Sequence, residues 1–240
     1  MTDPVVLTPA ASARAAVLAA ARELTDRGLV VGTEGNVSAR LDAAHFIVTP
    51  TGRNYVTLEP GDLPVVRADG TWYGRARPSS EWRFHRDVYA ARPEVGAIVH
   101  THSRHATALA CTGSGIPPFH YMVARAGGRD IRCAPYHTFG TQELSTAAVA
   151  ALTDRRACLL SHHGVIALGS APTDALALAA EVEELAAQYL AARALGPVPL
   201  LDAAEMERVL EKFRTYGTDS APDDDLVHGG PVRTEPGARS

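Results

Sequence analysis

Two histidines at strand spacing give the strongest chemical signal in the chain. His100 and His102 lie at the end of a β-rich run, and residues two apart on a strand point to the same face of a sheet, so both imidazoles can reach one ion. A turn between two later apolar runs carries His162 and His163, and either can supply a third ligand; Gly164 then predicts a sharp turn of the backbone. Such a His-only set suits catalytic zinc. On spacing alone, core histidines satisfied by hydrogen bonds fit equally well.

Three loops carry residue types that bind anions. Ser79 and Ser80 lie at the expected start of a helix, with Glu81 in its first turn. Hydroxyls, unpaired N–H groups and the helix dipole together favour a phosphate there, although the same residues are typical of plain capping. Segments 32–38 and 49–52 are rich in Gly, Thr and Asn and could orient N–H groups toward an anion, or be simple turns. Neither contains the glycine patterns of the usual nucleotide sites.

The presence of a single lysine restricts the catalytic mechanisms open to the chain. Lys212 is the only lysine in the chain, and its surroundings predict a solvated helix end. Schiff-base chemistry needs a lysine whose pKa is lowered by burial or by a neighbouring cation. We therefore expect the electrophile to come from a metal.

Composition and charge argue against several classes of binding partner. The net charge of -4 provides no basic field for nucleic acid, and no run reaches the length of a membrane-spanning helix. The N-terminal residues lack the basic flank and apolar stretch of a signal peptide, which predicts a cytoplasmic protein. The three cysteines, Cys111, Cys133 and Cys158, contain no C-x-x-C pair and are interpreted as buried thiols.

Helices and strands must position these residues. Helices are expected at 11–27, 80–92, 103–111, 141–153 and 173–195, with a last one after Asp202. Strands are expected at 36–41, 45–49, 63–67, 71–74, 95–102, 157–160 and 165–168, with a hairpin turn at Asp69-Gly70. The pattern predicts a single three-layer α/β/α domain around a mainly antiparallel sheet over residues 1–217, and a flexible tail over 218–240.

Residues 10–217 contain an ordered set of motifs. The first are Gly32-Thr33-x-Gly35-Asn36-x-Ser38, Thr49-Pro50-Thr51-Gly52, Pro78-Ser79-Ser80-Glu81-Trp82-x-x-His85, Arg92-Pro93-Glu94, His100-x-His102 and His162-His163-Gly164. Further motifs are Phe119-His120-Tyr121-Met122, Cys133-Ala134-Pro135-Tyr136, Thr138-Phe139-Gly140-Thr141 and the segment from Glu211 to Gly217. In this order and spacing, the set resembles the class II aldolase and adducin family, and within it the fuculose phosphate aldolases most closely.

The resemblance implies a role for each matching residue. His100, His102 and His163 would bind one zinc ion per chain, with Glu81 as a resting-state ligand and the acid/base. The substrate phosphate would be held by Gly35, Asn36, Thr51, Gly52, Ser79 and Ser80. Tyr121 would act at the zinc of a neighbouring subunit in a homotetramer, while Phe139 and Tyr216 would shape the aldehyde pocket. Glu34 departs from the family pattern, which has a small residue there, and its charge would repel a phosphate unless it points away or pairs with an arginine.

The implied activity is cleavage of a ketose 1-phosphate to dihydroxyacetone phosphate and an aldehyde such as lactaldehyde. A deoxypentulose 1-phosphate aldolase is the alternative that the same motifs fit. A pentulose phosphate 4-epimerase and a methylthioribulose phosphate dehydratase on this scaffold fit the segments around Tyr121 and Phe139 less well. A non-catalytic adducin-like assembly module could dispense with ligands, so the intact Glu81 and histidines count against it.

Overall fold

One sheet organises the chain, and the computed structural model describes residues 7–215 of it. Tyr216, the expected tail and the first residues lie outside this range. The strands are β1 (Asn36–Arg40), β2 (His45–Val48), β3 (Val65–Arg67), β4 (Trp72–Tyr73), β5 (Ala97–Thr101), β6 (Arg132–Ala134), β7 (Ala157–Leu160) and β8 (Gly164–Gly169). Their order is β4-β3-β2-β1-β5-β8-β7-β6, and within the described residues β6 and β7 form the one parallel pair.

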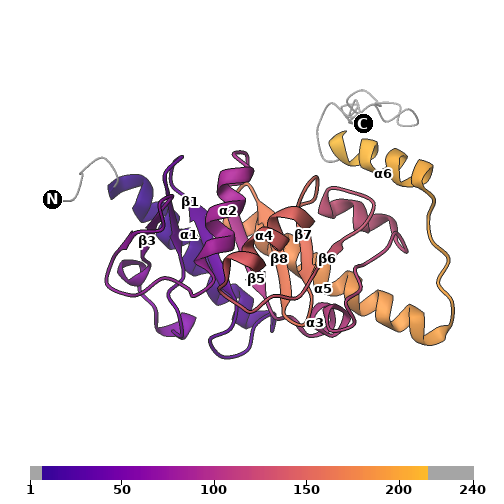
Figure 1. Ribbon diagram of the computed structural model, residues 1–240, viewed down its shortest axis with the longest axis horizontal. Coiled ribbons are helices and arrows are strands. Elements are labelled where there is room, and N and C mark those ends of the chain that lie inside the picture. The colour runs from indigo at the N-terminus through magenta and orange to yellow at the C-terminus, as the bar shows by residue number, and fades with distance from the viewer. Residues whose placement is uncertain (1–6, 216–240) are drawn as a thin grey trace, which may run out of the picture.

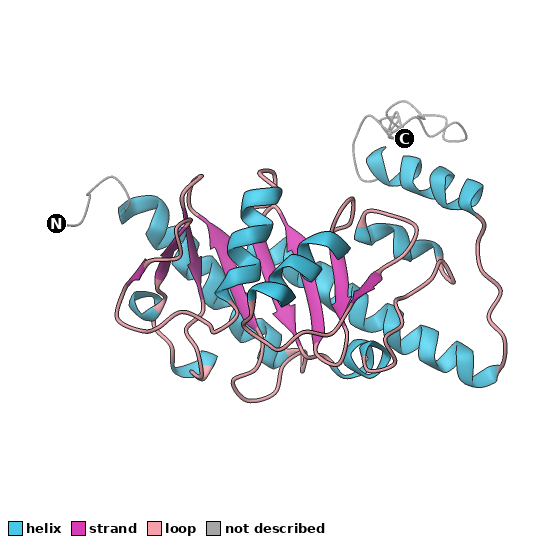
Figure 2. Cartoon of the chain, in the orientation of Figure 1, coloured by secondary structure: helices cyan, strands magenta, loops and turns pink. Residues whose placement is uncertain are grey.

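Helices cover both faces of the sheet, as Figures 1 and 2 show. The α-helices are α1 (Leu7–Asp26), α2 (Trp82–Ala91), α3 (Arg104–Ala110), α4 (Gln142–Ala151), α5 (Pro172–Leu195) and α6 (Ala203–Thr215). The 3-10 helices among the described residues are η2 (Tyr55–Thr57), η3 (Pro60–Asp62) and η4 (Tyr121–Ala126). Helices α1, α3 and α5 pack on one face, and α2 and α4 on the other, which confirms the predicted three-layer α/β/α class.

Along each strand, buried side chains alternate between the two faces of the sheet, so the core consists of two clusters. In β5, Ala97 and Val99 belong to the cluster under α1 and α5, whereas Ile98 packs with Phe84 and Val88 of α2. Because successive side chains of a strand point to opposite faces, the even-numbered residues of β5 face α2. This parity directs His100 toward the start of α2.

The predicted elements match the structure except that α1 begins at Leu7 rather than at residue 11, and except for three further features. Strand β6 and the 3-10 helices were not expected, because they are too short to carry a periodic pattern. Helix α2 begins at Trp82, so Ser79 and Ser80 precede the helix and Glu81 is its N-cap. The prediction that all cysteines are buried is wrong for Cys111, which is exposed at the end of α3, and only partly right for Cys133, which is half-buried.

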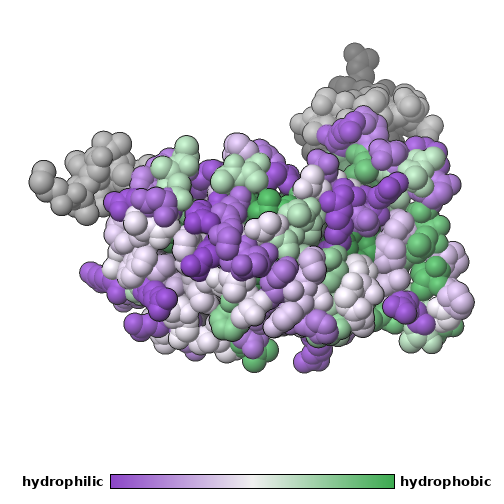
Figure 3. Space-filling model, viewed as in Figure 1, coloured by the Kyte–Doolittle hydropathy of each residue, from purple (hydrophilic) through white to green (hydrophobic). Residues whose placement is uncertain are grey.

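The described surface is largely polar in the view of Figure 3. Apolar side chains gather near the C-terminal end of α5 and the segment that follows it, where Leu195 and Leu200 are exposed. Among the described residues, no helix is long and apolar enough to cross a membrane.

Candidate active site

Four potential metal ligands meet at one end of the central strands. His100 belongs to β5, His102 follows that strand, and His163 directly precedes the neighbouring strand β8. Glu81 is added by the N-cap of α2. One ligand atom from each of the four residues lies within 4.8 Å of all the others. Of the two candidates for the third imidazole, the structure brings His163 into the group, whereas His162 is exposed beside it.

The hydrogen bonds of the histidines leave lone pairs facing the centre of the group. His100 Nδ1 lies 2.8 Å from the carbonyl oxygen of Val165, so in the neutral ring Nδ1 carries the proton and Nε2 carries the lone pair. His102 Nδ1 lies 3.5 Å from Glu34 Oε2, which favours the same tautomer. The two Nε2 atoms are 3.1 Å apart. Two lone pairs at this distance repel unless a cation lies between them, so the donor set fits a divalent metal.

Glu81 adds the negative charge that such a site needs. Its Oε2 lies 3.1 Å from His100 Nε2, and its Oε1 lies 3.1 Å from His163 Nε2 without hydrogen-bond geometry. Burial raises the pKa of Glu81, but His100 and His163 outweigh burial and hold the pKa far below its usual range. Burial, together with the same two rings, lowers the pKa of His102 to about 3. An ionised carboxylate and a neutral imidazole are the forms that bind a metal.

The turn before β8, which contains His163, differs from the predicted turn. The sharp bend lies at His162, whose φ of 54° is in the left-handed region, rather than at Gly164. Gly164 is needed for space instead, since a Cβ there would lie 2.2 Å from the Thr101 carbonyl oxygen. The close approach of β8 to β5 keeps His163 beside His102.

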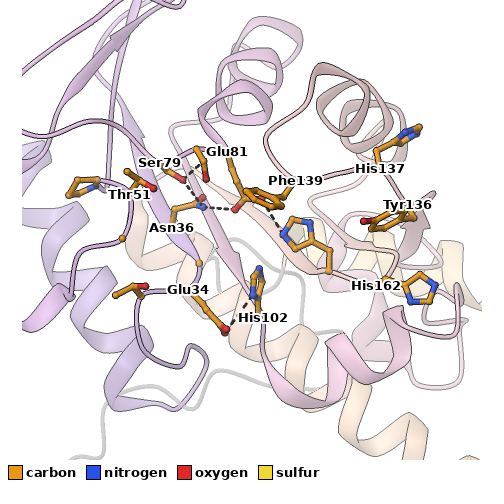
Figure 4. Close-up of a pocket in the computed structure, with 16 residues that line it drawn as sticks. Glu34, Asn36, Thr51, Ser79, Glu81, His102, Tyr136, His137, Phe139 and His162 are labelled. Atoms are coloured by element: carbon orange, nitrogen blue, oxygen red, sulfur yellow. Dashed lines mark hydrogen bonds and ion pairs between the residues drawn. The ribbon is translucent and has the colours of Figure 1, made fainter.

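A pocket of about 350 Å³ opens in front of these ligands. Figure 4 shows Glu81 and His102 at its inner end, Asn36, Ser79 and Thr51 along one side, and Tyr136 and His162 along the other. The six residues predicted to hold a phosphate all line it, as does Phe139. The sequence reasoning missed His137, which also lines the pocket and carried no distinguishing signal.

The predicted phosphate residues are held by hydrogen bonds of their own. Ser79 Oγ accepts from Asn36 Nδ2 at 3.1 Å and from the Glu81 backbone N–H at 3.2 Å, which leaves the hydroxyl proton as a donor for an anion. Gly35 has a φ of 72°, and a Cβ there would lie 2.6 Å from the His100 carbonyl oxygen. Tyr55, which the sequence reasoning missed, donates to the Gly35 carbonyl at 2.6 Å.

Backbone donors contribute less to the anion site than expected. The N–H groups of Thr51 and Ser79 donate to the carbonyl oxygens of Arg77 and Thr49. Neither residue can therefore offer its backbone N–H to a ligand without breaking a bond between these loops. Among the described residues that line the pocket, none is Lys or Arg, so an anion there depends on hydroxyls and on the remaining N–H groups.

Glu34 pairs with a histidine rather than with an arginine. Its carboxylate lies 3.5 Å from His102 Nδ1, as the dashed line in Figure 4 marks. The carboxylate also lines the pocket beside Gly35 and Asn36. The negative charge of Glu34 thus lies near the potential metal ligand His102, but it would still repel an anion bound in the pocket.

Two predicted residues lie away from this pocket in their own chain. Tyr121 is exposed on η4, where its ring stacks against Phe213 at 6.4 Å, and it does not line the pocket. Lys212 is exposed on α6, as expected of a solvated helix end. The active-site geometry therefore offers no lysine among its lining residues.

Comparison with known proteins identifies the family. Residues 15–190 match the Class II Aldolase and Adducin N-terminal domain. The chain is 52% identical over 204 residues to the 5-methylthioribulose-1-phosphate/5-deoxyribulose-1-phosphate aldolase of Rhodospirillum rubrum, which covers 85% of this chain and 92% of that protein. It is 47% identical over 196 residues to the L-fuculose phosphate aldolase of Escherichia coli K12, covering 81% and 91%.

A solved L-fuculose 1-phosphate aldolase has the same fold. It superposes with a TM-score of 0.81 at 34% identity, covering 89% of this chain and 98% of the other. The chain belongs to the class II aldolase and adducin family, as the motifs predicted. Class II aldolases are metal-dependent lyases, and the partly buried His/Glu group is where this chain could bind the ion.

Proposed function

We propose that the protein is a zinc-dependent aldolase that cleaves a ketose 1-phosphate to dihydroxyacetone phosphate and an aldehyde with an apolar end. The observation that carries the proposal is the convergence of Glu81 and three imidazoles at a pocket lined by Asn36, Ser79 and Thr51. His100, His102, His163 and Glu81 would hold a divalent ion, which would supply Lewis-acid stabilisation of the charge on the ketose carbonyl.

The residues of the chain divide the remaining work. Cleavage removes the proton from the C4 hydroxyl, breaks the C3–C4 bond to give the aldehyde, and leaves its electron pair to form an enediolate over C2 and C3. The proton released from the C4 hydroxyl is passed on to the Glu81 carboxylate, and Glu81 then delivers it to C3, which gives dihydroxyacetone phosphate and leaves Glu81 ionised again. Gly35, Asn36, Thr51, Gly52, Ser79 and Ser80 hold the phosphate and align the breaking bond.

Two substrate classes compete for the proposal. L-Fuculose 1-phosphate would give L-lactaldehyde, a 5-deoxypentulose 1-phosphate would give acetaldehyde, and its methylthio analogue would give (methylthio)acetaldehyde. Each of these aldehydes ends in a methyl or methylthio group, which suits contact with Phe139 and Tyr136 at the pocket rim. The higher identity to the methylthioribulose/deoxyribulose phosphate aldolase favours the second class.

The test is a product assay across a panel of ketose 1-phosphates. Purified enzyme is incubated with L-fuculose 1-phosphate, 5-deoxyribulose 1-phosphate and 5-methylthioribulose 1-phosphate, and dihydroxyacetone phosphate and the aldehyde are quantified separately. We expect equimolar products, with the largest kcat/KM for a 5-deoxypentulose compound. Conversion of these compounds without release of dihydroxyacetone phosphate would overturn the aldolase proposal.

We further propose that the active form is a homotetramer whose sites lie between subunits. The support is that Tyr121 does not line the pocket of its own chain and that its side chain is 50% exposed. In this arrangement a neighbouring Tyr121 accepts the C4 hydroxyl proton, while Phe139 and Tyr216 bound the aldehyde.

Mixed oligomers test the sharing of sites. Chains carrying Glu81→Gln and chains carrying Tyr121→Phe are each expected to be nearly inactive, whereas tetramers assembled from both should regain activity through sites that combine wild-type residues. Verified mixed oligomers without recovery would place Tyr121 outside the shared chemistry.

A further inference from the structure

A buried row of polar side chains lies behind the pocket and is not explained by metal or phosphate binding. Asn36 and Ser38 of β1 point to the same face as His100, because Val37 and Ala39, which alternate with them along the strand, belong to the opposite core cluster. Facing them is one side of α2, where His85 lies one turn beyond Glu81 and Tyr89 one turn further. All four of these polar side chains behind Glu81 are at most 5% exposed.

The hydrogen bonds of this row run from Tyr89 to the acid/base. Tyr89 OH lies 2.7 Å from Ser38 Oγ, and Ser38 Oγ lies 2.7 Å from His85 Nδ1. His85 Nε2 lies 2.5 Å from Asn36 Oδ1. The amide of Asn36 then donates from Nδ2 to Glu81 Oε2 at 2.9 Å and to Ser79 Oγ at 3.1 Å. The row thus ends on both the carboxylate and the hydroxyl that face the pocket.

Each donor and acceptor in the row follows from its chemistry. Glu81 is ionised and can only accept, so the Asn36 group beside it must be the NH2, and Oδ1 must face His85. Oδ1 can only accept, so His85 Nε2 carries the proton and Nδ1 accepts from Ser38. Ser38 in turn accepts from the Tyr89 hydroxyl. Burial is the largest cause that lowers the pKa of His85 to about 3, which keeps the ring in this neutral form.

The alternative orientation of Asn36 shows what His85 prevents. A flipped amide would bring Oδ1 against the Glu81 carboxylate, placing two acceptors in contact, and would withdraw the donor from Ser79. With His85 donating to Oδ1, the flip would also leave a buried N–H group facing another N–H group. Buried polar groups without partners are costly, so the row selects one orientation.

We infer that His85, supported by Ser38 and Tyr89, is a positioning residue that fixes the amide of Asn36, and through it the orientation of Glu81 and Ser79. This inference rests on the proposed function for its kinetic part only. The side chain of His85 does not line the pocket, and its hydrogen bonds reach Glu81 and Ser79 through Asn36. The metal affinity of the group, to which Glu81 contributes, tests the same inference without any turnover.

A matched pair of substitutions separates positioning from packing. The amide nitrogen of Gln at residue 85 can take the place of Nε2 and still donate to Asn36, whereas the shorter Asn can reach Ser38 but not Asn36. Both changes replace the ring by an uncharged amide. Ser38→Ala is a third variant, smaller and less disruptive, which removes the donor that fixes the His85 tautomer.

The measurements are zinc affinity by competition with a chelator, kcat and KM for the best ketose 1-phosphate, and the thermal midpoint. For His85→Asn we expect zinc affinity and kcat to fall about 10- to 100-fold. For His85→Gln we expect both to stay within about threefold of wild type, with a thermal midpoint similar to that of His85→Asn. For Ser38→Ala we expect a loss of about threefold to tenfold in both quantities.

The measurements distinguish failure of the inference about His85 from failure of the proposed function. Equal zinc affinities in folded His85→Gln and His85→Asn would overturn the inference, and so would a folded Ser38→Ala with wild-type zinc affinity and kcat if the His85 variants do not fold. A wild-type enzyme that cleaves no ketose 1-phosphate would instead refute the proposed function, while the zinc affinities would still decide the role of His85.

Discussion

The two ends of the pocket are built in opposite ways. At the inner end, His100 and Glu81 are carried by the central strand β5 and the start of α2, are 0% and 7% exposed, and share a network of short polar contacts. At the outer rim, Tyr136 and Phe139 lie between β6 and α4 and are 58% and 65% exposed. The side chains of the inner end are buried and are held by the sheet and the start of α2, whereas those of the rim are exposed.

This difference suggests that the inner end of the pocket performs the chemistry and that the rim selects among substrates. Groups that must hold charge at a set geometry belong on rigid elements with their polar atoms satisfied. Residues that contact a variable aldehyde can lie on loops, which tolerate substitution. We therefore expect substitutions at the inner end to reduce turnover for every substrate, and substitutions at the rim to change the preference among substrates.

The largest expected effect among the substitutions comes from Glu81→Gln. The amide keeps the shape but cannot accept a proton, so kcat should fall about 100- to 10,000-fold while KM changes little. Steady-state kinetics measures the split, and Glu143→Gln, which removes an exposed carboxylate from the first turn of α4, is the matched control. A raised KM with normal kcat would mean that Glu81 only starts a helix.

A smaller effect, of the opposite kinetic type, is expected from Ser79→Ala and Ser80→Ala. A phosphate clamp holds the ground state and the transition state alike, so each change should raise KM about tenfold with little loss of kcat. Ser170→Ala, on the exposed loop before α5, serves as the control. Unchanged binding of a phosphate-bearing inhibitor in the double variant would show that the phosphate lies elsewhere.

Phe139→Ala tests the rim. Loss of apolar contact should lower kcat/KM about threefold to tenfold for substrates with a methyl or methylthio end, and less for one ending in a hydroxyl. The ratio of the two values is the measurement, with Trp72→Ala, exposed on β4 outside the pocket, as control. An equal decrease for all substrates would remove the distinction between the two ends.

The smallest effect is expected at Lys212. Because no lysine lines the pocket among residues 7–215, Lys212→Met should leave kcat within about threefold of wild type. Borohydride added with substrate should not inactivate the enzyme. Inactivation by that treatment would point to an imine and would contradict metal-assisted cleavage.

The sequence could predict the inner end better than the rim. Strand parity placed His100 and His102 on one face. The hydrogen-bonded row behind Glu81 was not predicted, because it depends on the packing of α2 against β1. The choice between His162 and His163 required the left-handed bend, which spacing alone does not encode. The pairing of Glu34 with His102 depends on tertiary distance, and the edge strand β6 is too short to show a pattern.

The central claim is that turnover depends on a divalent ion held by His100, His102, His163 and Glu81. Elemental analysis combined with the aldolase assay, during chelator titration and zinc restoration, tests it most directly. The account predicts about one ion per chain, activity that falls in proportion to the metal content, and recovery when zinc is returned. Full activity in metal-free protein would contradict it.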